Sequence, residues 1–449
     1  MKRYDSYKDS GVEWIGEIPS EWECIRLGML GTFSSSGIDK KSNEDETPVR
    51  MVNYTDLIKG RKYYPIQNGQ KKYMRVTTPQ SKFKEHKLEK GDMVFIPSSE
   101  THEDLGYSSL IDFEEDDFVY SYHILRYKTK KPIYHYYKKY LINHHSVLNQ
   151  FSSECKGTTR KIIGRDVFNN VRVVLPPLSE QQQIVSFLDT KTSLIDSLIE
   201  KTQRKIELLK EKRTSLINEV VTKGLNSNVE MKDSGVEWVG EIPSHWLFTK
   251  FNRFVFFQEG PGLRTFQFTD EGTKVICVTN ITEKGIDFTY KKFISTDEYI
   301  EKYQHFTVEK GDYLLSSSGN SWGKVSEYLD DEKVMLNTST IRLNTIGSSI
   351  YNKSLIPHIL KSEVVRKQLE ILMTGSCQPN FGPSHLNQLV IPIPPLSEQQ
   401  QIVSYLDEQT QLIDNTISVE EKRIELLKEY RQSLISEVVT GKLKVTTDE

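Results

Sequence analysis

PPLSEQQQIVS occurs twice in this chain of 449 residues, at 176–186 and again at 394–404. The two copies lie 218 positions apart (394 − 176). Two consecutive prolines lack backbone donors and end a preceding element, and the polar run after them is typical of a helix start. Ser179, followed three residues later by Gln182, predicts an N-cap with a capping box. We therefore expect each copy to close one globular domain and to begin a long helix.

Apolar residues after each copy recur at spacings of three, four and seven, the pattern of a heptad seam. The first helix carries Ile184, Leu188, Ile195, Ile199, Ile206, Leu209, Leu216 and Val220 on this seam. The second helix carries Ile402, Leu406, Ile413, Ile417, Ile424, Leu427, Leu434 and Val438. Each helix covers about 43 residues, roughly 64 Å at 1.5 Å per residue, and Gly224 and Gly441 are suitable stop signals.

An apolar stripe of this length is not stable in water, so we expect the two helices to pack on each other. Parallel and antiparallel pairs both satisfy the heptads. Because both halves share one design, an antiparallel pair related by an internal pseudo-two-fold axis is favoured, with the two domains at opposite ends.

The whole chain is a tandem repeat. A leading motif, DSGVEWIGEIPSEW at 9–22, recurs as DSGVEWVGEIPSHW at 233–246. Between 176–225 and 394–443, 33 of 50 positions are identical, whereas the stretches between leading motif and helix share only scattered landmarks such as EKGD. The helices therefore perform one task twice and the intervening domains perform related but different tasks. Recent duplication or gene conversion is the alternative explanation for the identities.

Charged residues outside the seam are also repeated. They are Glu207, Lys210, Glu211, Arg213 and Ser215, which recur as Glu425, Lys428, Glu429, Arg431 and Ser433. A solvated face with i,i+4 support is one explanation. Two identical partner subunits that dock symmetrically are the other.

Composition describes a polar globular protein, with 37% hydrophobic and 27% charged residues and a net charge of −3. No stretch approaches the ~20 apolar residues that cross a bilayer, and the N-terminal sequence lacks the apolar core of a signal peptide. Cys24, Cys155, Cys277 and Cys377 form no CxxC pair, which indicates free thiols and a reducing cytoplasm rather than disulfides or zinc.

With the duplicated leading motif, the PPLSEQQQIV helix starts and the endings EKRTSLINEVVTKGL and EYRQSLISEVVTGKL, the chain resembles the specificity subunit of Type I restriction–modification systems. The resemblance covers essentially the whole chain. It implies two mixed α/β target-recognition domains, at 1–175 and 226–393, separated by two long helices, at 176–225 and 394–443, with a tail at 444–449. The fold class is α+β, with the helices forming an antiparallel coiled coil.

The resemblance also implies what the parts do. Each domain reads one half of a split, asymmetric site in double-stranded DNA, and the helices act as a ruler between the halves. Two methyltransferase subunits, which bind S-adenosylmethionine and methylate adenine N6, bind this subunit. Restriction (motor-nuclease) subunits, which use ATP and magnesium, complete the complex. The chain itself is then non-catalytic, cytoplasmic, free of cofactors and not bound to membranes.

DNA-binding candidates in the first domain form a basic, tyrosine-rich run around NGQ at 68–70, which predicts a β-ribbon hairpin. They are Lys59, Arg61, Lys62, Lys71, Lys72 and Arg75. Such a ribbon enters the major groove, where Arg or Lys reads guanine and Gln or Asn reads adenine. An ordinary solvated hairpin is the alternative. The later stretch 127–145 is typical of an amphipathic helix whose aromatic residues face the core.

Polar loops supply the other candidates. KGTTRK at 156–161 lies opposite GSCQPN at 375–380, and SSSGNSWGKV at 316–325 lies opposite PSSETHEDLG. The candidate side chains in these loops and in EGPGLRTF are Arg160, Lys161, Arg264, Asn320, Trp322, Lys324, Gln378 and Asn380. Turns that merely close the domains are the alternative.

Catalytic motifs are missing from the sequence. GNSWGK at 319–324 fails the phosphate-loop spacing, and Val325 replaces the hydroxyl that binds magnesium. The Pro-Pro pairs are followed by leucine, unlike the Asn/Asp-Pro-Pro-aromatic sequence of adenine methyltransferases. Two other hypotheses stay open, a coiled-coil scaffold with protein-binding domains and a self-contained modification enzyme.

Overall fold

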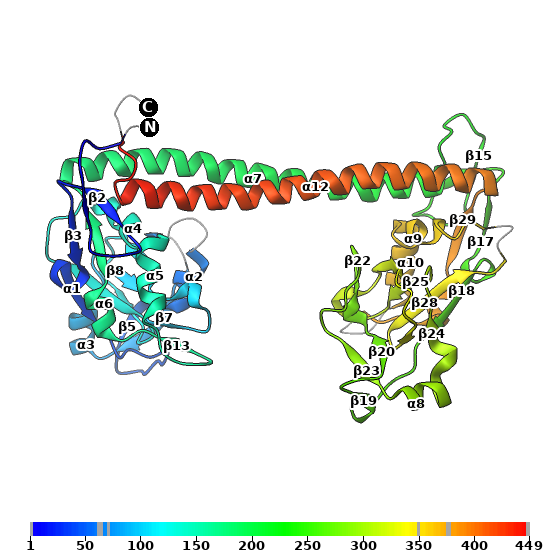
Figure 1. Cartoon of the computed structure of the whole chain (residues 1–449), viewed down its shortest axis with the longest axis horizontal. Coiled ribbons are helices and arrows are strands. Elements are labelled where there is room, and N and C mark those ends of the chain that lie inside the picture. Colours follow the sequence, from blue (N-terminus) through cyan, green and yellow to red (C-terminus); the bar gives the residue numbers. More distant parts are fainter. Residues whose placement is uncertain (1–2, 61–65, 70–71, 348–350, 374–378, 446–449) are drawn as a thin grey trace. The chain divides into compact units, whose positions relative to one another are not determined.

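The structure is a computed structural model that describes residues 3–60, 66–69, 72–347, 351–373 and 379–445. The chain divides into two compact units, Met1–Gln203 with Lys422–Glu449, and Arg204–Glu421. Each unit holds one globular α/β domain, the start of one long helix and the end of the other (Figure 1).

The long helices are α7 (Leu178–Lys223) and α12 (Leu396–Val439). The carbonyl oxygen of Pro177 accepts the amides of Glu180 and Gln181 at 3.0 and 3.1 Å, and Pro395 does the same for α12. The predicted capping box is therefore wrong. Since the helix begins at Leu178, Ser179 already lies inside the first turn and the second proline takes the capping position, where it needs no donor.

The two helices pack together in antiparallel directions. In the first unit Arg431 Nε lies 2.8 Å from Asp196 Oδ1, and in the second Arg213 Nε lies 3.0 Å from Asp414 Oδ1. These pairs are repeats of each other, since 196 and 414 differ by 218, as do 213 and 431. Residues late in one helix thus contact residues early in the other, which is the direction favoured by the sequence.

The heptad positions face the partner helix or the globular domain. Leu209, Leu216 and Leu427 are half-buried. The other positions of the seam are buried: Ile184, Leu188, Ile195, Ile199, Ile206, Val220, Ile402, Leu406, Ile413, Ile417, Ile424, Leu434 and Val438.

The first domain is built on two main sheets of its described residues. One has the order β4-β12-β8-β10-β6: β4 (Gly31–Ser34), β12 (Leu125–Thr129), β8 (Met93–Phe95), β10 (Ser108–Ile111) and β6 (Ile66–Gln67). The other has the order β11-β5-β7: β11 (Phe118–Tyr120), β5 (Thr47–Val52) and β7 (Met74–Thr78). Its short helices are α1 (Leu27–Leu30), α2 (Tyr54–Gly60), α3 (Gln80–His86), α4 (Lys138–Leu141), α5 (His145–Ser153) and α6 (Arg165–Asn170).

The second domain repeats this layout. Its first sheet is β18-β28-β25-β26: β18 (Val255–Glu259), β28 (Thr340–Thr345), β25 (Tyr313–Ser316) and β26 (Val325–Glu327). Its second sheet is β19-β23-β20-β27-β24: β19 (Phe268–Thr269), β23 (Lys292–Ile294), β20 (Thr273–Ile276), β27 (Val334–Leu336) and β24 (Thr307–Val308). Its helices are α8 (Thr296–Glu298), α9 (Leu355–Leu360), α10 (Glu363–Leu372) and α11 (Pro383–Leu386).

Short ladders complete each domain. In the first they join β1 (Tyr7–Asp9) to β2 (Glu17–Pro19), β3 (Glu23–Arg26) to β14 (Arg172–Leu175), and β9 (Ser98–Ser99) to β13 (Lys161–Ile162). In the second they join β15 (Met231–Asp233) to β16 (Glu241–Pro243), β17 (Leu247–Lys250) to β29 (Val390–Ile393), and β21 (Ile281–Thr282) to β22 (Gly285–Ile286).

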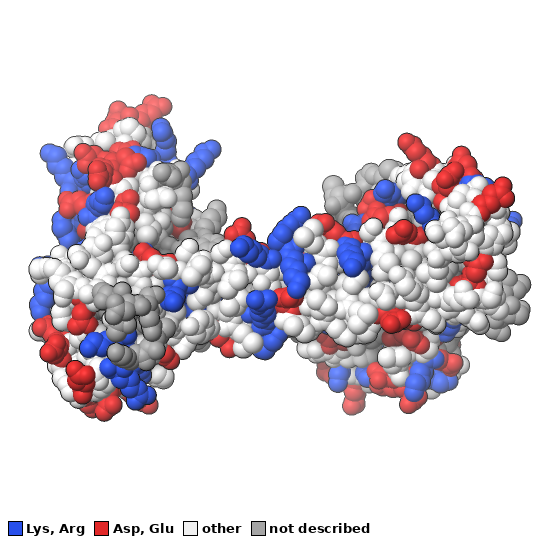
Figure 2. All heavy atoms as spheres, turned by 90° about the horizontal axis from the view of Figure 1, so that it is seen from above, with Lys and Arg blue, Asp and Glu red and all other residues white. Residues whose placement is uncertain are grey.

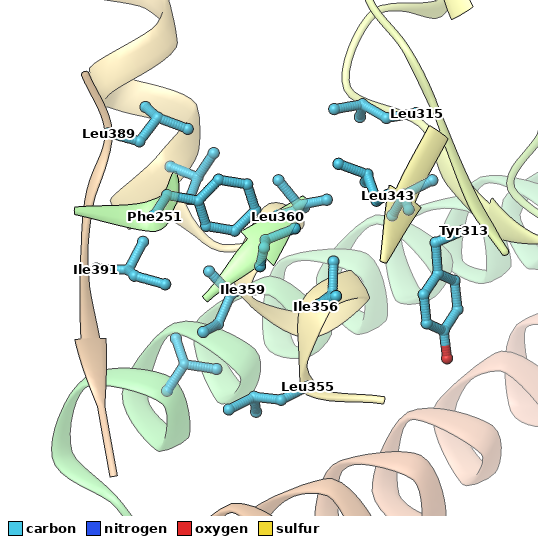
Figure 3. Packing of buried hydrophobic residues seen from close by; sticks show 14 of the residues in the cluster. Phe251, Tyr313, Leu315, Leu343, Leu355, Ile356, Ile359, Leu360, Leu389 and Ile391 are labelled. Carbon is cyan, nitrogen blue, oxygen red and sulfur yellow. The ribbon is translucent and has the colours of Figure 1, made fainter. Parts of the chain in front are cut away.

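The core of the second unit is continuous with its ends of the long helices. Phe251, Ile359, Leu360 and Leu343 converge between sheet and helices (Figure 3). The same cluster includes residues of α7 and α12, namely Leu216, Ile217, Val220, Val221, Ile402, Val403 and Leu406. The helix ends are thus part of the domain core and share its hydrophobic stabilisation.

A tryptophan of each leading motif is anchored on the first turn of a long helix. Trp22 Nε1 donates to Glu180 Oε2 at 3.3 Å, and Trp246 Nε1 donates to Glu398 Oε2 at 2.9 Å. The neighbouring glutamines fasten the prolines: Gln181 Nε2 donates to the Pro176 carbonyl at 2.9 Å. The repeated SEQQQ therefore ties the leading motif to the helix start.

The glycines that end the helices meet the same tryptophans. Gly224 has φ +75° and Gly441 has φ +72°, conformations that favour glycine. A Cβ on Gly224 would lie 3.0 Å from the Trp246 ring, and one on Gly441 would lie 3.0 Å from the Trp22 ring. Each tryptophan thus sits between the start of one helix and the end of the other.

Candidate nucleic-acid interface

Four loops gather at one end of the main sheet in each domain. Strands β4 and β8 end where the antiparallel β12 begins, so the segments next to these strand ends lie together. We name the segments L1 (35–41 and 259–266), L2 (98–104 and 316–324), L3 (121–123 and 337–339) and L4 (156–161 and 379–382). This cluster contains most of the loop residues that the sequence singled out.

Backbone hydrogen bonds join the loops of the first domain. The amide of Tyr122 in L3 donates to the Ile38 carbonyl of L1 at 3.0 Å. L2 meets L4 where β9 pairs with β13. Positive charge gathers here: burial first, and then the nearby charges of Arg160 and Lys40, hold the pKa of His123 below its ordinary value.

The loops of the second domain are joined in the same way. Thr338 N in L3 donates to Pro261 O in L1 at 2.9 Å, and Ser317 N in L2 donates to Ser339 O in L3 at 3.0 Å. Gly319 N in L2 donates to the Pro379 carbonyl of L4 at 3.1 Å. The repeated loops therefore form one connected surface in each domain, which sequence order alone does not reveal.

The structure distributes the predicted DNA-binding residues among three groups. Exposed side chains are those of Lys72, Arg75, Arg160, Arg264, Asn320 and Asn380. Half-buried side chains are those of Lys161, Trp322 and Lys324. Arg61, Lys62, Lys71 and Gln378 lie outside the described residues; Lys59 lies in α2, and its side chain is outside the described part.

The predicted basic β-ribbon is wrong. β6 pairs in parallel with β10, whereas β7 pairs with β5 in the other sheet, so the two strands do not form a hairpin. Tyr73 between them is buried and its hydroxyl donates to Gln67 Oε1 at 2.8 Å. The tyrosine fills the core and separates the strands, while Lys72 and Arg75 stay exposed.

The stretch 127–145 is only partly helical. It begins in β12, passes through the 3-10 helix η3 (His135–Tyr137) and becomes helical in α4. Tyr127, Tyr137 and Tyr140 are buried, as the amphipathic pattern predicted. Lys138 and Lys139 are buried as well, and Lys138 Nζ donates to the Gly91 carbonyl at 2.7 Å, whereas Lys128, Lys130 and Lys131 are exposed.

Trp322 is held by neighbours from two other elements. Its ring lies edge-on to Phe381, with 6.3 Å between ring centroids, and the Arg366 guanidinium lies 5.7 Å from its centroid. Indole, phenyl and guanidinium thus form a fixed group beside the exposed Asn320. A rigid aromatic group of this kind positions polar neighbours more precisely than a free loop would.

Two exposed aromatic side chains of the loops were not among the DNA-binding residues predicted from the sequence. Tyr122 in L3 is 48% exposed and lies on the ring of His123 at 3.8 Å between centroids, and Phe266 in L1 is 85% exposed. Aromatic rings at such positions stack on bases. The signal that could have found them is an aromatic residue at a strand end next to a Gly- or Ser-rich turn.

A groove of about 430 Å³ lies beside the first domain's loops. Two guanidinium groups and two amides line it, together with small residues that leave it open: Arg26, Gly28, Met29, Gly31, Thr32, Phe33, Arg165, Asn169 and Asn170. Donors line this groove and no carboxylate is among its lining residues, which suits an acceptor of DNA such as a phosphate oxygen or a guanine edge.

The outward faces of the long helices carry paired charges. Arg204 Nη1 lies 2.8 Å from Glu207 and Lys422 Nζ lies 3.0 Å from Glu425, and these two pairs are repeats of each other. Figure 2 shows lysine and arginine side chains gathered over the middle of the helices. Leucines are exposed on the same helices at repeated positions: Leu194 and Leu412, and Leu208 and Leu426.

Arg213 and Arg431 differ from the other repeated charges. Their ion pairs with Asp414 and Asp196 join the two helices, so the expectation that they belong to the outer charged face is wrong. Glu207, Lys210, Glu211 and Ser215 are exposed, as are Glu425, Lys428, Glu429 and Ser433.

Within the described residues, no group of three or more His, Cys, Asp or Glu side chains is arranged to hold a metal ion. Cys24, Cys155 and Cys277 are free thiols. None of the described helices is both long and apolar enough to cross a membrane.

Comparison with known proteins places these features in one family. The model of the Type I restriction modification DNA specificity domain matches twice, at residues 19–208 and 243–429. The MjaVIII specificity subunit of Methanocaldococcus jannaschii is 27% identical over 296 residues, 65% of this chain and 67% of that protein. The EcoKI specificity subunit of Escherichia coli (strain K12) is 35% identical over 202 residues, 38% of this chain and 44% of that protein.

A chain in a solved structure of a type I R-M system has the same fold, with a TM-score of 0.71 at 16% identity over 95% of this chain and 99% of that one. The two matches to the family model cover most of each globular domain and most of each long helix. The chain therefore belongs to the Type I restriction modification DNA specificity family, and it is the non-catalytic specificity subunit that recognises DNA for such a system and carries no cofactor itself.

Proposed function

We propose that each globular domain reads one half of a bipartite, asymmetric site in double-stranded DNA. The domains are 1–175 and 226–393. The observation that carries the proposal is that L1 to L4 occupy the same frame in both domains but differ in chemistry, with His123 and Arg160 in one and Ser339 and Asn380 in the other. A repeated frame with different loops suits two different half-sites.

Chemistry sorts the candidate residues into three roles. Lys72, Arg75, Arg160, Lys161, Arg264 and Lys324 contact phosphate or guanine, because their cationic donors match both. Asn320 and Asn380 read adenine through paired donor and acceptor atoms. Trp322 acts by fixing its loop.

The long helices, at 176–225 and 394–443, set the length of the spacer between the half-sites, and 444–449 is a tail. Support comes from the second unit, where the end of α7 and the start of α12 are built into the domain core and Leu406 packs in the same cluster as Phe251. The length of a helix pair with anchored ends then sets the distance between the two DNA half-sites that the domains bind.

Two methyltransferase subunits dock on the outward faces of the helices. The repeated exposed charges and the repeated exposed Leu194 and Leu412 support this, since a duplicated surface suits two copies of one partner. The methyltransferase subunits bring S-adenosylmethionine, and restriction subunits bring ATP and magnesium. The complex acts in the cytoplasm, where its DNA lies.

A domain exchange tests the proposal. Replacing residues 233–393 with the equivalent stretch of a relative changes one half-site and leaves the other unchanged, because base contacts lie within one domain. Genome-wide mapping of methylated adenines in a strain that expresses the chain with its methyltransferase measures both half-sites. A change in both half-sites would contradict modular reading. Absence of sequence-specific DNA binding by the assembled complex would favour a protein scaffold instead.

A further inference from the structure

The two domains can be aligned residue by residue where the edge strand enters L1. Arg126 lies opposite Ser34 in the ladder and its Nε donates to Ser34 Oγ at 3.2 Å. Arg342 lies opposite Gln258 and its Nη2 donates to Gln258 Oε1 at 2.8 Å. Ser34 and Gln258 are therefore equivalent. The next residues, Ser35 and Glu259, occupy the same position.

This shared position carries opposite charges. In the first domain Arg165 Nη2 donates to Ser35 Oγ at 3.2 Å, and Arg165 is exposed. In the second domain Pro383 replaces Arg165, 218 positions later, and Glu259 replaces Ser35. A Cβ on Gly382 would lie 3.1 Å from Glu259 Oε2, so glycine leaves the room that the carboxylate uses.

The Glu259 carboxylate is held by a strained residue. Its Oε1 accepts the Ser339 amide at 3.0 Å. Ser339 has φ +62° and is the one non-glycine residue of the described chain with positive φ, a conformation that costs about 1 kcal/mol or more. The Ser339 carbonyl in turn accepts the Ser317 amide at 3.0 Å. Hydrogen bonds on both sides therefore keep this residue aimed at the carboxylate.

A carboxylate among DNA-facing loops has a narrow range of partners. No described lysine, arginine or histidine forms an ion pair with Glu259, and DNA phosphates repel it. Exocyclic amino groups of cytosine or adenine can donate to it in the major groove. Adenine presents the N7 acceptor beside its amino group, which repels a carboxylate and suits an amide, so cytosine fits better.

We infer that Glu259 accepts a hydrogen bond from the N4 amino group of a cytosine in the half-site of the second domain. Arg165 donates to a guanine at the matching position in the half-site of the first domain, because guanine N7 and O6 are acceptors. The same structural position thus selects a base that accepts a hydrogen bond in the first domain and a base that donates one in the second. This inference rests on the proposed reading of one half-site by each domain.

The test uses the full chain assembled with its methyltransferase subunits and a pool of duplexes that is randomised over the recognition site. Methylated duplexes are selected and sequenced for the wild type, E259Q, R165Q and the control E271Q, which changes an exposed carboxylate of the second domain. E259Q lowers the preference for cytosine at one position of the second half-site about tenfold or more. R165Q does the same for guanine at one position of the first half-site, and E271Q leaves both half-sites unchanged.

Several outcomes would overturn the inference. One is a second half-site that keeps every base preference in E259Q. Another is an assembled E259Q complex that no longer binds DNA at all, because removing a negative charge from the interface should strengthen non-specific binding. A change in the wrong half-site, or in both, would instead contradict the proposed reading of one half-site by each domain.

Discussion

Trp22 and Trp246 explain why three distant motifs of each half recur together. Each indole donates to a glutamate of SEQQQ and lies against the glycine that ends the other helix. The leading motif, the helix start and the helix end therefore meet at one tryptophan. A change in any one of them disturbs the other two, so all three motifs are needed to maintain the same contact.

The anchor on Glu398 makes a quantitative prediction. Glu398→Ala leaves the indole N–H of the buried Trp246 without its acceptor, which lowers the free energy of unfolding by about 1–3 kcal/mol. Glu398→Gln keeps an acceptor oxygen and costs less. Urea denaturation of the two variants and the wild type measures the difference. Equal losses in both variants would show that the hydrogen bond is not the cause.

A second residue predicts a dependence on pH. Burial lowers the pKa of His144 to about 3, while the unfolded value is near 6.5. Between these values the unfolded chain binds the extra proton, so stability is complete above pH ~6.5 and is lost as pH falls. From pH 7 to pH 5 the loss is about 2 kcal/mol.

Urea denaturation at pH 7 and pH 5 checks this effect. His144→Leu removes the titrating group, so its stability falls less between the two pH values than that of the wild type. His145→Gln is a second variant: burial is the main cause of the low pKa of His144, and the nearby charge of His145 lowers that pKa further, so this replacement weakens the pH dependence less than His144→Leu does. An unchanged pH dependence in His144→Leu would refute the assignment.

At the scale of elements, the helix pair uses one ion pair twice in two environments. Arg431 and Asp196 are 9% and 21% exposed, whereas Arg213 and Asp414 are 23% and 47% exposed. Breaking a buried pair leaves an uncompensated charge, while an exposed pair is screened by water. The two equivalent pairs therefore allow the effect of burial on the stabilisation by an ion pair to be compared within one chain.

Arg431→Ala is expected to lower the free energy of unfolding by about 3 kcal/mol, because Asp196 then stays partly buried without its partner. Arg213→Ala, the repeat-equivalent change, costs about 1 kcal/mol or less. Chemical denaturation of the two single variants compares them directly. Equal losses would mean that burial does not decide the strength of this contact.

At the scale of the whole molecule, the proposed ruler predicts a change in spacer length. One heptad is inserted into both helices at matched positions, after Gln203 and after Glu421, so that the seam stays paired. Seven residues add ~10 Å, which corresponds to about three base pairs. Both half-site sequences stay the same, because the loops are untouched.

Mapping of methylated adenines measures the new spacer. An insertion of the same length at 226–229, in the turn between α7 and the second domain, is the control and leaves the spacer unchanged. An unaltered spacer after the paired helix insertion would count against the ruler.

The predictable and unpredictable features separate by the range of the interactions that cause them. The long helices are predictable from the heptad spacing of apolar residues alone, because positions such as Ile184 and Leu188 form an apolar stripe whatever they pack against. The predicted cap was wrong by two residues (179 − 177), since Pro177 and Ser179 are both acceptable at a helix start and the competition between them is local and small. The β-ribbon failed for a longer-range reason: β6 pairs with β10 and β7 pairs with β5 in the other sheet, and no local pattern reports those partners.

The sequence by itself determined the tandem repeat, the two long helices and the family, because identity and heptad period are properties of the chain order; it favoured the antiparallel pairing, which the contacts between the helices then showed. Only the tertiary structure decided which loops meet. L1 and L3 are far apart in the sequence, and they are joined by single backbone hydrogen bonds such as that from Thr338 to Pro261, 77 positions away (338 − 261). The role inferred for Glu259 in base recognition depends on these contacts between loops, because only the structure places Ser339 and Gly382 beside its carboxylate.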